Sequence, residues 1–177
     1  WGSGGVGGTE PARFEEVIVA ARDDRDAVAG IVECCVEGLP GALGEPFFDS
    51  AESMIAHVLF AIPAVKGVEF GSGFAAARMR GSEYNDRIVD ASGLTATNHD
   101  GGINGGIITG NPLIVRAVIK PTPSIAREQL TYDLATDSMQ PLVIRGRHDA
   151  CIALRAAVVV EAAVAIALAD LLCRCRS

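Results

Sequence analysis

The chain has 177 residues, and its 15 lysine and arginine residues are outnumbered by 22 aspartate and glutamate residues, which gives a formal net charge of −7. Because 49% of the residues are apolar, the chain can bury the core of one domain, and low-complexity disorder is excluded. General nucleic-acid or membrane-surface binding needs a basic footprint, so the acidic composition disfavours both of these classes.

The beginning of the chain is rich in glycine. Five of residues 1–8 are glycine, a composition typical of a flexible segment. We therefore predict a flexible N-terminal segment over residues 1–12 and one folded domain over residues 13–177. No basic stretch followed by an apolar run begins the sequence, so we expect no signal peptide.

The five cysteines do not suggest a disulfide framework. Their number is odd, and Cys34 and Cys35 are neighbours that cannot pair easily. This pattern favours a reducing compartment, and we expect a cytoplasmic protein. Cys173 and Cys175 lack the spacing of a zinc site, so no metal ligand is predicted.

Two hydrophobic periodicities predict the helices and strands. Apolar residues recur at helical spacing over residues 15–22, over a segment that begins near Asp49 as N-cap and ends before Pro63, and over residues 156–172. Alternation or short apolar runs predict strands over residues 31–37, 65–70, 75–80, 113–120 and 142–145. This combination indicates the α+β class, in one unit.

Residues 156–172 form a strongly apolar stretch. Its length is at the short limit for crossing a bilayer, and Glu161 and Asp170 would be costly inside one. We therefore expect no membrane span but a long C-terminal helix that is buried on nearly all sides.

The passage over residues 98–107 contains two Gly-Gly pairs separated by Ile103 and Asn104. Glycine allows a ligand to approach the backbone closely, and successive N–H groups can bind an anion. The same glycines are typical of ordinary turns, so both interpretations stay open from the residues alone. A Walker loop is excluded because no Gly-Lys-Ser/Thr follows.

Cations gather in two places despite the acidic composition. Arg116 and Lys120 lie on one face of the strand predicted over residues 113–120, which suggests that this face meets something anionic. Arg147 follows the last predicted strand and could bind a phosphate or carboxylate, while Asp149 could act as a base. A surface ion pair for Arg147 and a helix N-cap for Asp149 are the simpler alternatives. His99 and His148 are isolated in the sequence, and such histidines are more often structural than catalytic; His57, on a predicted helix, is assigned no role.

Six segments together resemble the C-terminal half of chorismate synthase in order and spacing. They are residues 38–46, 62–69, 81–86, 98–102, 120–124 and 146–151. The Arg-His-Asp-x-Cys motif that ends at Cys151 is highly specific, and the glycine-rich segments are less so. The resemblance covers roughly residues 15–172. Ala150 and Val158 stand where the family usually has proline.

The resemblance implies an activity and a fold. Members of this family convert 5-enolpyruvylshikimate 3-phosphate to chorismate by 1,4-elimination of phosphate, in aromatic amino acid biosynthesis, and they require reduced FMN. Their fold is a sandwich of antiparallel sheets and helices, and they are usually homotetramers. By this resemblance we expect a phosphorylated small-molecule substrate, a homo-oligomer, and neither a nucleic-acid nor a membrane partner.

The same resemblance assigns the site residues. Asp149 matches an acidic residue that is thought to assist proton transfer at flavin N5. The residues that match FMN ligands are Pro63, Ala64, Gly105, Lys120, Pro121, Thr122, Pro123, Ser124 and Arg147. Fixed cations suit the phosphate and carboxylate groups of such ligands.

Two other functions remain open. The motifs of the family's N-terminal half, including its two catalytic histidines, do not occur in this sequence. The alternative is therefore a non-catalytic FMN- or phosphate-binding or assembly module, and the chain could be a fragment or one product of a split gene. A generic α+β domain whose glycines only form turns is the third interpretation.

Overall fold

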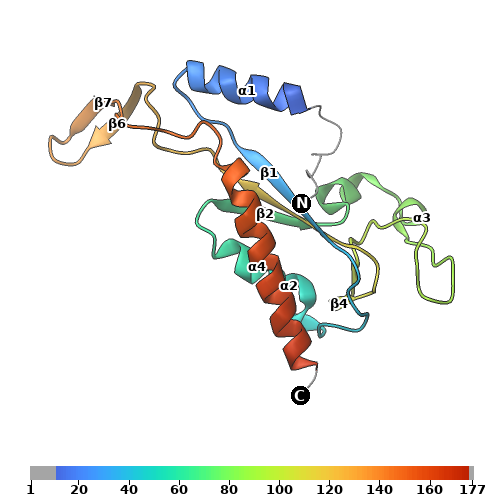
Figure 1. Cartoon of the computed structure of the whole chain (residues 1–177). Coiled ribbons are helices and arrows are strands. Elements are labelled where there is room, and N and C mark those ends of the chain that lie inside the picture. The colour runs from blue at the N-terminus through green and yellow to red at the C-terminus, as the bar shows by residue number, and fades with distance from the viewer. Residues whose placement is uncertain (1–10, 176–177) are drawn as a thin grey trace. The chain divides into compact units, whose positions relative to one another are not determined.

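The computed structural model describes residues 11–175, which divide into two compact units (Figure 1). The first unit contains residues 11–30 and 120–154, and the second contains residues 31–119 and 155–175. We had expected one unit. Most of the predicted flexible segment lies outside the described residues, and its last two residues begin the first helix.

The second unit is built on a three-stranded sheet with the strand order β1-β5-β2. The strands are β1 (Gly30–Val36), β5 (Leu113–Ile119) and β2 (Val65–Phe70). β2 and β5 are antiparallel, and a bulge lies between Val65 and Gly67. Side chains of β5 alternate between buried and half-buried, so one face of the sheet belongs to the core.

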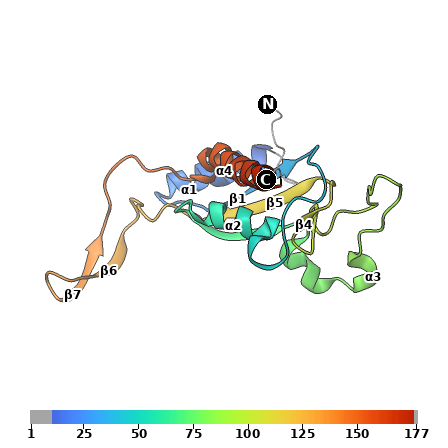
Figure 2. The ribbon, with the colours of Figure 1, turned by 90° about the horizontal axis from the view of Figure 1, so that it is seen from below.

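Two helices lie over that face of the sheet (Figures 1 and 2). Helix α2 (Ala51–Phe60) buries Ala51, Ile55 and Leu59, which recur at four-residue spacing. Helix α4 (Ala153–Arg174) buries a stripe of one side. The core comprises these helical stripes and the inward side chains of β5, namely Leu113, Val115, Ala117 and Ile119.

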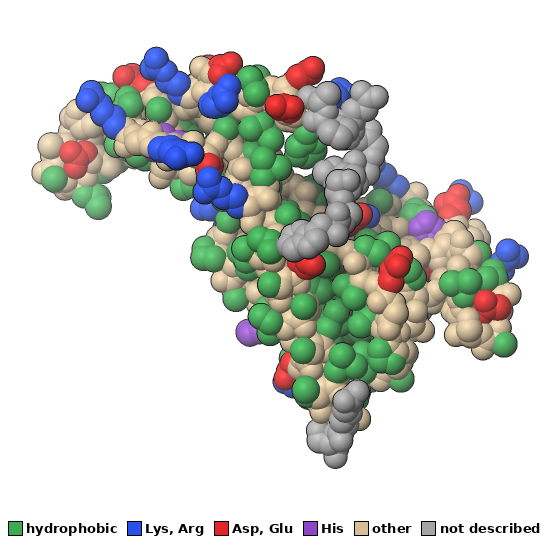
Figure 3. Space-filling view, in the orientation of Figure 1, with side chains coloured by type: hydrophobic (Ala, Val, Ile, Leu, Met, Phe, Trp, Pro, Cys, Tyr) green, Lys and Arg blue, Asp and Glu red, His purple; other side chains and the backbone are tan. Residues whose placement is uncertain are grey.

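The outward side of α4 differs from our expectation of burial on nearly all sides. Val158 is 55% exposed and Ile166 is 63% exposed, whereas Val160 and Val164 on the opposite side are buried. Figure 3 shows hydrophobic side chains along the visible side of this helix. By length and composition alone α4 could also cross a membrane, but core helices of soluble proteins satisfy the same criterion.

The polar passage between β2 and β5 contains only short elements. They are the 3-10 helix η2 (Gly73–Arg78), the one-turn helix α3 (Gly81–Tyr84), and the paired strands β3 (Ile103–Asn104) and β4 (Ile107–Ile108). Another 3-10 helix, η1 (Phe47–Asp49), precedes α2. Backbone hydrogen bonds, such as those from Ser72 to His99 and from Ala96 to Arg87, and side-chain hydrogen bonds together hold this passage.

The first unit contains helix α1 (Pro11–Asp23) and a hairpin of β6 (Gln129–Asp133) and β7 (Ser138–Leu142). Arg127 links the base of the hairpin to the segment after α1, because its guanidinium donates to Asp26 at 3.3 Å and also pairs with Asp24. The Arg127 N–H also donates to the carbonyl of Arg25.

Some of the predicted helices and strands are confirmed, and others are wrong. The helices expected over residues 15–22 and 156–172 and the strands expected over residues 31–37, 65–70 and 113–120 are confirmed. The strand expected over residues 75–80 is wrong, because those residues belong mostly to η2. The strand expected over residues 142–145 is wrong too, since the hairpin comes earlier in the chain.

Candidate functional site

The predicted ligand residues fall into two groups, one in each compact unit. Pro63, Ala64 and Gly105 belong to the second unit. The first unit contains residues 120–124 together with Arg147 and Asp149.

Gly105 occupies the turn of the β3–β4 hairpin. Gly105 and Gly106 both have positive φ, 60° and 88°, as a two-residue hairpin turn requires. A Cβ on Gly105 would meet nothing within 4 Å, so the backbone there is open to a ligand. A Cβ on Gly106 would instead lie 2.7 Å from the Cβ of Ser50, and the Gly106 carbonyl accepts a hydrogen bond from the N–H of Ala51. The turn is thereby fixed at the start of α2.

Asp86 ties down the segment that leads to this turn. Its carboxylate accepts the N–H of His99 at 2.8 Å, the N–H of Asp100 at 2.9 Å and the hydroxyl of Thr97 at 2.7 Å. Burial alone would raise the pKa of Asp86, but these donors lower it below the ordinary value of a carboxyl group. Asp86 therefore acts as an anionic anchor for the glycine passage.

Tyr84 and Asp100 form a second link across the same passage. The Tyr84 hydroxyl donates to a carboxylate oxygen of Asp100 at 2.6 Å, and this bond, with burial, raises the pKa of Tyr84 to about 12. The Tyr84 ring also stacks on His99, whose Nδ1 is hydrogen-bonded to Ser72 at 2.8 Å. Because Tyr84 stays protonated at neutral pH, it positions the loop and donates a hydrogen bond.

The charge around the glycine turn is negative. Glu52 at the start of α2 has a raised pKa because it is partly buried and because the Asp100 carboxylate is near. Asp100 also accepts a hydrogen bond from the Asn104 amide, one residue before Gly105. A phosphate would be repelled by these carboxylates, so the turn suits an uncharged part of a ligand. The anion-binding interpretation of the glycine pairs is therefore not favoured by their surroundings.

Sequence reasoning assigned no role to Tyr84 or Asp86. Both lie in the segment over residues 81–86 that carries the family resemblance, which was the available signal. Their partners lie 11 to 16 residues further along the chain, so periodicity could not connect them.

The segment over residues 120–124 leaves β5 and contains polar groups without partners among residues 11–175. The half-buried Lys120 ammonium makes no hydrogen bond or ion pair there. The Thr122 hydroxyl oxygen is buried and likewise has no hydrogen-bond partner in that range. A buried hydroxyl without a partner costs free energy, so Thr122 is a candidate for binding a group from outside the described residues. Pro121 and Pro123 are exposed.

Arg147 and Asp149 lie in the segment between the hairpin and α4. Arg147 is exposed, and its guanidinium makes no hydrogen bond within the described range. His148 Nε2 is hydrogen-bonded to the carbonyl of Ile144 at 2.8 Å, and the Ala150 carbonyl accepts the N–H of Val28. These two contacts fix the backbone on both sides of the half-buried Asp149.

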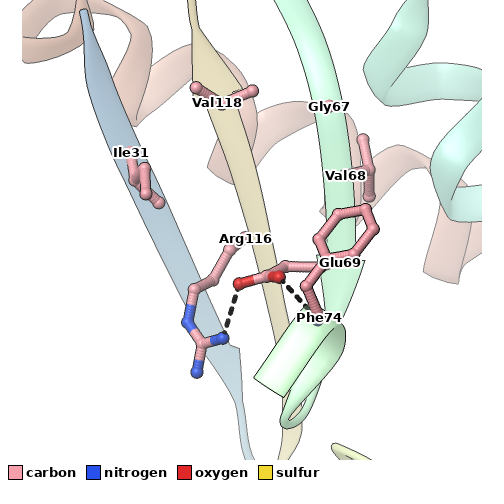
Figure 4. Close-up of a pocket in the computed structure, with 7 residues that line it drawn as sticks. All are labelled: Ile31, Gly67, Val68, Glu69, Phe74, Arg116 and Val118. Atoms are coloured by element: carbon pink, nitrogen blue, oxygen red, sulfur yellow. Dashed lines mark hydrogen bonds and ion pairs between the residues drawn. The ribbon is translucent and has the colours of Figure 1, made fainter. Parts of the chain in front are cut away.

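The cations predicted to share one strand face have different surroundings. Arg116 lies in a shallow apolar hollow on the second face of the sheet, beside Ile31 and Phe74 (Figure 4). Its guanidinium donates to Glu33 at 2.7 Å and to Glu69 at 2.9 Å. The protein's own carboxylates thus supply the anion that we expected this face to meet.

Possible metal ligands do not gather within the part of the chain that the structure describes. No group of three or more His, Cys, Asp or Glu side chains there could hold an ion. None of the five cysteines forms a disulfide, and burial raises the pKa of Cys34, with a further contribution from the charge of Glu161.

Comparisons with known proteins give a consistent result. The family model described as chorismate synthase matches residues 8–173. Over 156 residues the sequence is 60% identical to a chorismate synthase of Chitinophaga pinensis, covering 88% of this chain and 47% of that protein. It is 51% identical to one of Korarchaeum cryptofilum, covering 89% of this chain and 44% of that protein.

A solved structure agrees with the sequence comparisons. A crystal structure of chorismate synthase superposes on 91% of this chain with a TM-score of 0.72 and 30% sequence identity, and the match covers 42% of that protein. The chain therefore spans less than half the length of these relatives.

Proposed function

Because the chain belongs to the chorismate synthase family of lyases, we propose that it supplies FMN- and substrate-binding groups for the 1,4-elimination of phosphate from 5-enolpyruvylshikimate 3-phosphate. The product of that reaction is chorismate. We further propose a cytoplasmic location and a homo-oligomer, with four copies as the family resemblance implies.

The observation that carries this proposal is the set of unsatisfied groups in residues 120–124. The Thr122 hydroxyl is buried without a partner among the described residues, and the Lys120 ammonium, two residues earlier in the chain, has no counter-ion among them. A ligand that brings hydrogen-bond acceptors and negative charge suits both groups. FMN, with its phosphate and its carbonyl oxygens, is such a ligand.

The remaining proposed ligands differ in the part of the cofactor that they suit. The Arg147 guanidinium matches a phosphate or carboxylate group by its planar donors. The open backbone at Gly105, with acidic neighbours, suits the uncharged ring system. Pro63 and Ala64 lie between α2 and β2, where a short turn presents their backbone. Reduced FMN, when bound, supplies the electron-rich ring that the elimination requires.

Asp149 is the proposed proton-holding group. Its half-buried carboxylate lies on a backbone fixed by the contacts of His148 and Ala150. In this role it holds or moves a proton at flavin N5, and the fixed backbone keeps it oriented through the reaction.

Thr122→Val tests the cofactor site with two readouts. Valine has a similar shape but no hydroxyl, so the variant should unfold at the same or a higher temperature in the absence of FMN while its FMN affinity falls. Thr131→Val, on the exposed hairpin, is the matched control and should change neither quantity. Undiminished FMN affinity in Thr122→Val would refute the assigned site.

Arg147→Ala tests the proposed phosphate-binding cation. Loss of a charged hydrogen bond should weaken FMN binding by about 1.5 to 3 kcal/mol, which fluorescence titration can measure. Arg22→Ala is the control, since Arg22 is exposed and pairs with its neighbour Asp23. Equal affinities for the two variants would remove Arg147 from the site.

The enzyme proposal itself requires a turnover assay under reducing conditions with FMN. It should be run on this chain and on a version joined to the N-terminal half of a relative. The joined form should make chorismate, and Asp149→Asn should slow it while leaving FMN binding mostly intact. Flavin binding without turnover in the joined form would instead support a non-catalytic binding module, an alternative that the short coverage of the relatives keeps open.

A further inference from the structure

We propose that Asp100 is a positioning residue, which holds the backbone of Gly105 in place for a ligand through the Asn104 side chain. Gly105 is one of the proposed cofactor ligands, so this inference rests on the proposed function and deepens it. Asp100 acts on the turn of the β3–β4 hairpin and is not itself assigned as a ligand.

Gly105 differs from the other three glycines of the two Gly-Gly pairs. A Cβ added to Gly101, Gly102 or Gly106 would lie 2.3, 2.5 or 2.7 Å from the nearest atom, so packing holds these three glycines. A Cβ on Gly105 would meet nothing within 4 Å, and Gly105 is exposed. Packing by the described residues therefore does not fix Gly105, and the position of its backbone depends on the residues before and after it.

The residues on either side of Gly105 are held by hydrogen bonds. On the α2 side, the Gly106 carbonyl accepts the N–H of Ala51 at 2.8 Å. On the other side, the amide of Asn104 donates to a carboxylate oxygen of Asp100 at 3.1 Å. β3 and β4 contain only two residues each, so their own backbone pairing holds the turn weakly. The Asp100–Asn104 bond therefore decides how firmly the β3 side of the turn is held.

Asp100 is itself fixed through its backbone and its side chain. Its N–H donates to the Asp86 carboxylate at 2.9 Å, and its second carboxylate oxygen accepts the Tyr84 hydroxyl at 2.6 Å. The Tyr84 ring in turn stacks on His99. A carboxylate fixed in this way can hold Asn104 in one place. A turn that is ordered before binding spares the ligand the free energy of ordering it.

Asn104→Asp tests the positioning bond, because it places two carboxylates face to face. In NMR relaxation of the ligand-free protein, the order parameter of the Gly105 amide should fall to the range of flexible backbone, below about 0.6. FMN affinity, measured by fluorescence titration, should fall by roughly threefold to tenfold. Asn85→Asp is the control, since it adds the same charge to an exposed side chain that makes no hydrogen bond among residues 11–175. It should change neither quantity.

A second substitution at position 100 should rescue the first. In the double variant Asp100→Asn/Asn104→Asp, the asparagine at position 100 can still accept the Tyr84 hydroxyl with its oxygen and can donate its N–H to the aspartate at position 104. The Gly105 order parameter and the FMN affinity should return to nearly the wild-type values. Asp90→Asn/Asn104→Asp has the same net charge and should give no recovery, because Asp90 bonds only to Ser92 and Leu94 in its own turn.

Tyr84→Phe tests the other partner of Asp100 and keeps the ring that stacks on His99. With one of its two side-chain bonds lost, Asp100 should hold the turn less firmly, and FMN affinity should fall by about twofold to fivefold. Tyr132→Phe is the matched control and should leave FMN affinity unchanged, because the Tyr132 hydroxyl also bonds to an aspartate, but on the hairpin of the first unit. Thermal melting checks that each variant is folded.

Three results would overturn the proposal. They are an unchanged Gly105 order parameter in Asn104→Asp, equal recovery with Asp90→Asn and with Asp100→Asn, and a mobile turn that binds FMN as tightly as the wild type. Weaker FMN binding in Thr122→Val but not in Asn104→Asp would refute the positioning role and leave the cofactor site intact. If the wild-type chain binds no FMN, the cofactor site is refuted, and the order parameters of the ligand-free protein still decide whether Asp100 holds the turn.

Discussion

Replacing Asp86 by asparagine should loosen the glycine passage without removing any apolar contact. The Asp86 carboxylate accepts three hydrogen bonds, from two backbone N–H groups and one hydroxyl, and these hold the segment over residues 97–100. Asparagine has the same shape but only one acceptor oxygen. In either orientation its amide N–H₂ group would face a backbone N–H that now has no acceptor.

The expected loss of stability follows from these bonds. Hydrogen bonds to a charged group contribute about 1.5 to 3 kcal/mol, and the half-buried position of Asp86 reduces that value through solvent screening. We therefore expect Asp86→Asn to lower the free energy of unfolding by about 2 kcal/mol. If the passage opens locally, the amide protons of His99 and Asp100 should exchange roughly 30-fold faster.

The pH dependence has a definite sign. The pKa of Asp86 is lowered in the folded protein, so its contribution is fully present above the unfolded pKa of about 3.9 and is lost as the pH falls through the lower folded value. The difference between wild type and Asp86→Asn should therefore be constant from neutral pH down to about 5 and shrink below about 4.

Urea unfolding at several pH values and amide hydrogen exchange measure these effects. Asp90→Asn is the matched control, because Asp90 bonds locally to Ser92 and Leu94 and does not touch His99 or Asp100. It should leave the exchange of those two amides unchanged. Equal exchange rates in wild type and Asp86→Asn, or a stability difference that persists unchanged at pH 3, would refute the anchoring role.

Four further substitutions test the packing around the sites. Gly71→Ala should abolish folding of the second unit or cost several kcal/mol, because its Cβ would lie 2.1 Å from the carbonyl oxygen of His99 at a φ of 52°. Gly105→Ala should cost only about 1 kcal/mol, because its Cβ would meet nothing within 4 Å and only the positive φ opposes it. Thermal melting compares the two variants. Leu59→Ala should cost about 2 to 5 kcal/mol in urea unfolding because Leu59 is fully buried in α2. Arg116→Gln should cost about 1 kcal/mol or less, most of it lost at high salt, because its ion pairs are partly exposed.

The sequence predicts best those elements whose pattern is local and strong. β2 is found over the predicted residues, and β5 ends one residue earlier than predicted, because alternating apolar residues have one arrangement that buries them. The N-cap of α2 shows the usual limit. Ser50, one residue after the predicted Asp49, accepts the hydrogen bond from Ser53, and both residue types cap helices well.

The turn residues of the β6–β7 hairpin explain why the sequence did not predict this hairpin. A glycine after asparagine or aspartate is the usual signal for a tight hairpin, and this turn has none. Asp137 instead adopts the positive φ of 53° that such a turn needs. The carboxylate of Asp137 also receives a hydrogen bond from the Tyr132 hydroxyl, which helps to hold this conformation. Pattern reasoning therefore placed a strand after the hairpin and none within it.

The η2 segment shows the opposite error. The alanines at the start of residues 75–80 resemble a short apolar strand, but the Glu69 carboxylate accepts the N–H of the preceding Phe74 at 3.1 Å. Gly73 enters the segment with a φ of 49°, which no strand adopts. A short apolar run without periodicity fits both structures, and the tertiary contact of Glu69 decides between them.

The structure shows which cations of the chain are paired with carboxylates, and the sequence motifs alone do not. In this acidic chain each exposed cation has many possible carboxylate partners, and the structure separates those that have one from those that do not. Arg116 is held by Glu33 and Glu69, and Arg127 is held by Asp24 and Asp26, so binding an external anion would break existing ion pairs. Lys120 and Arg147 have no such pair among the described residues. Lys66, Arg78 and Arg145 also have no ion pair among residues 11–175, so the electrostatics are compatible with the two cations that the family resemblance assigns without singling them out.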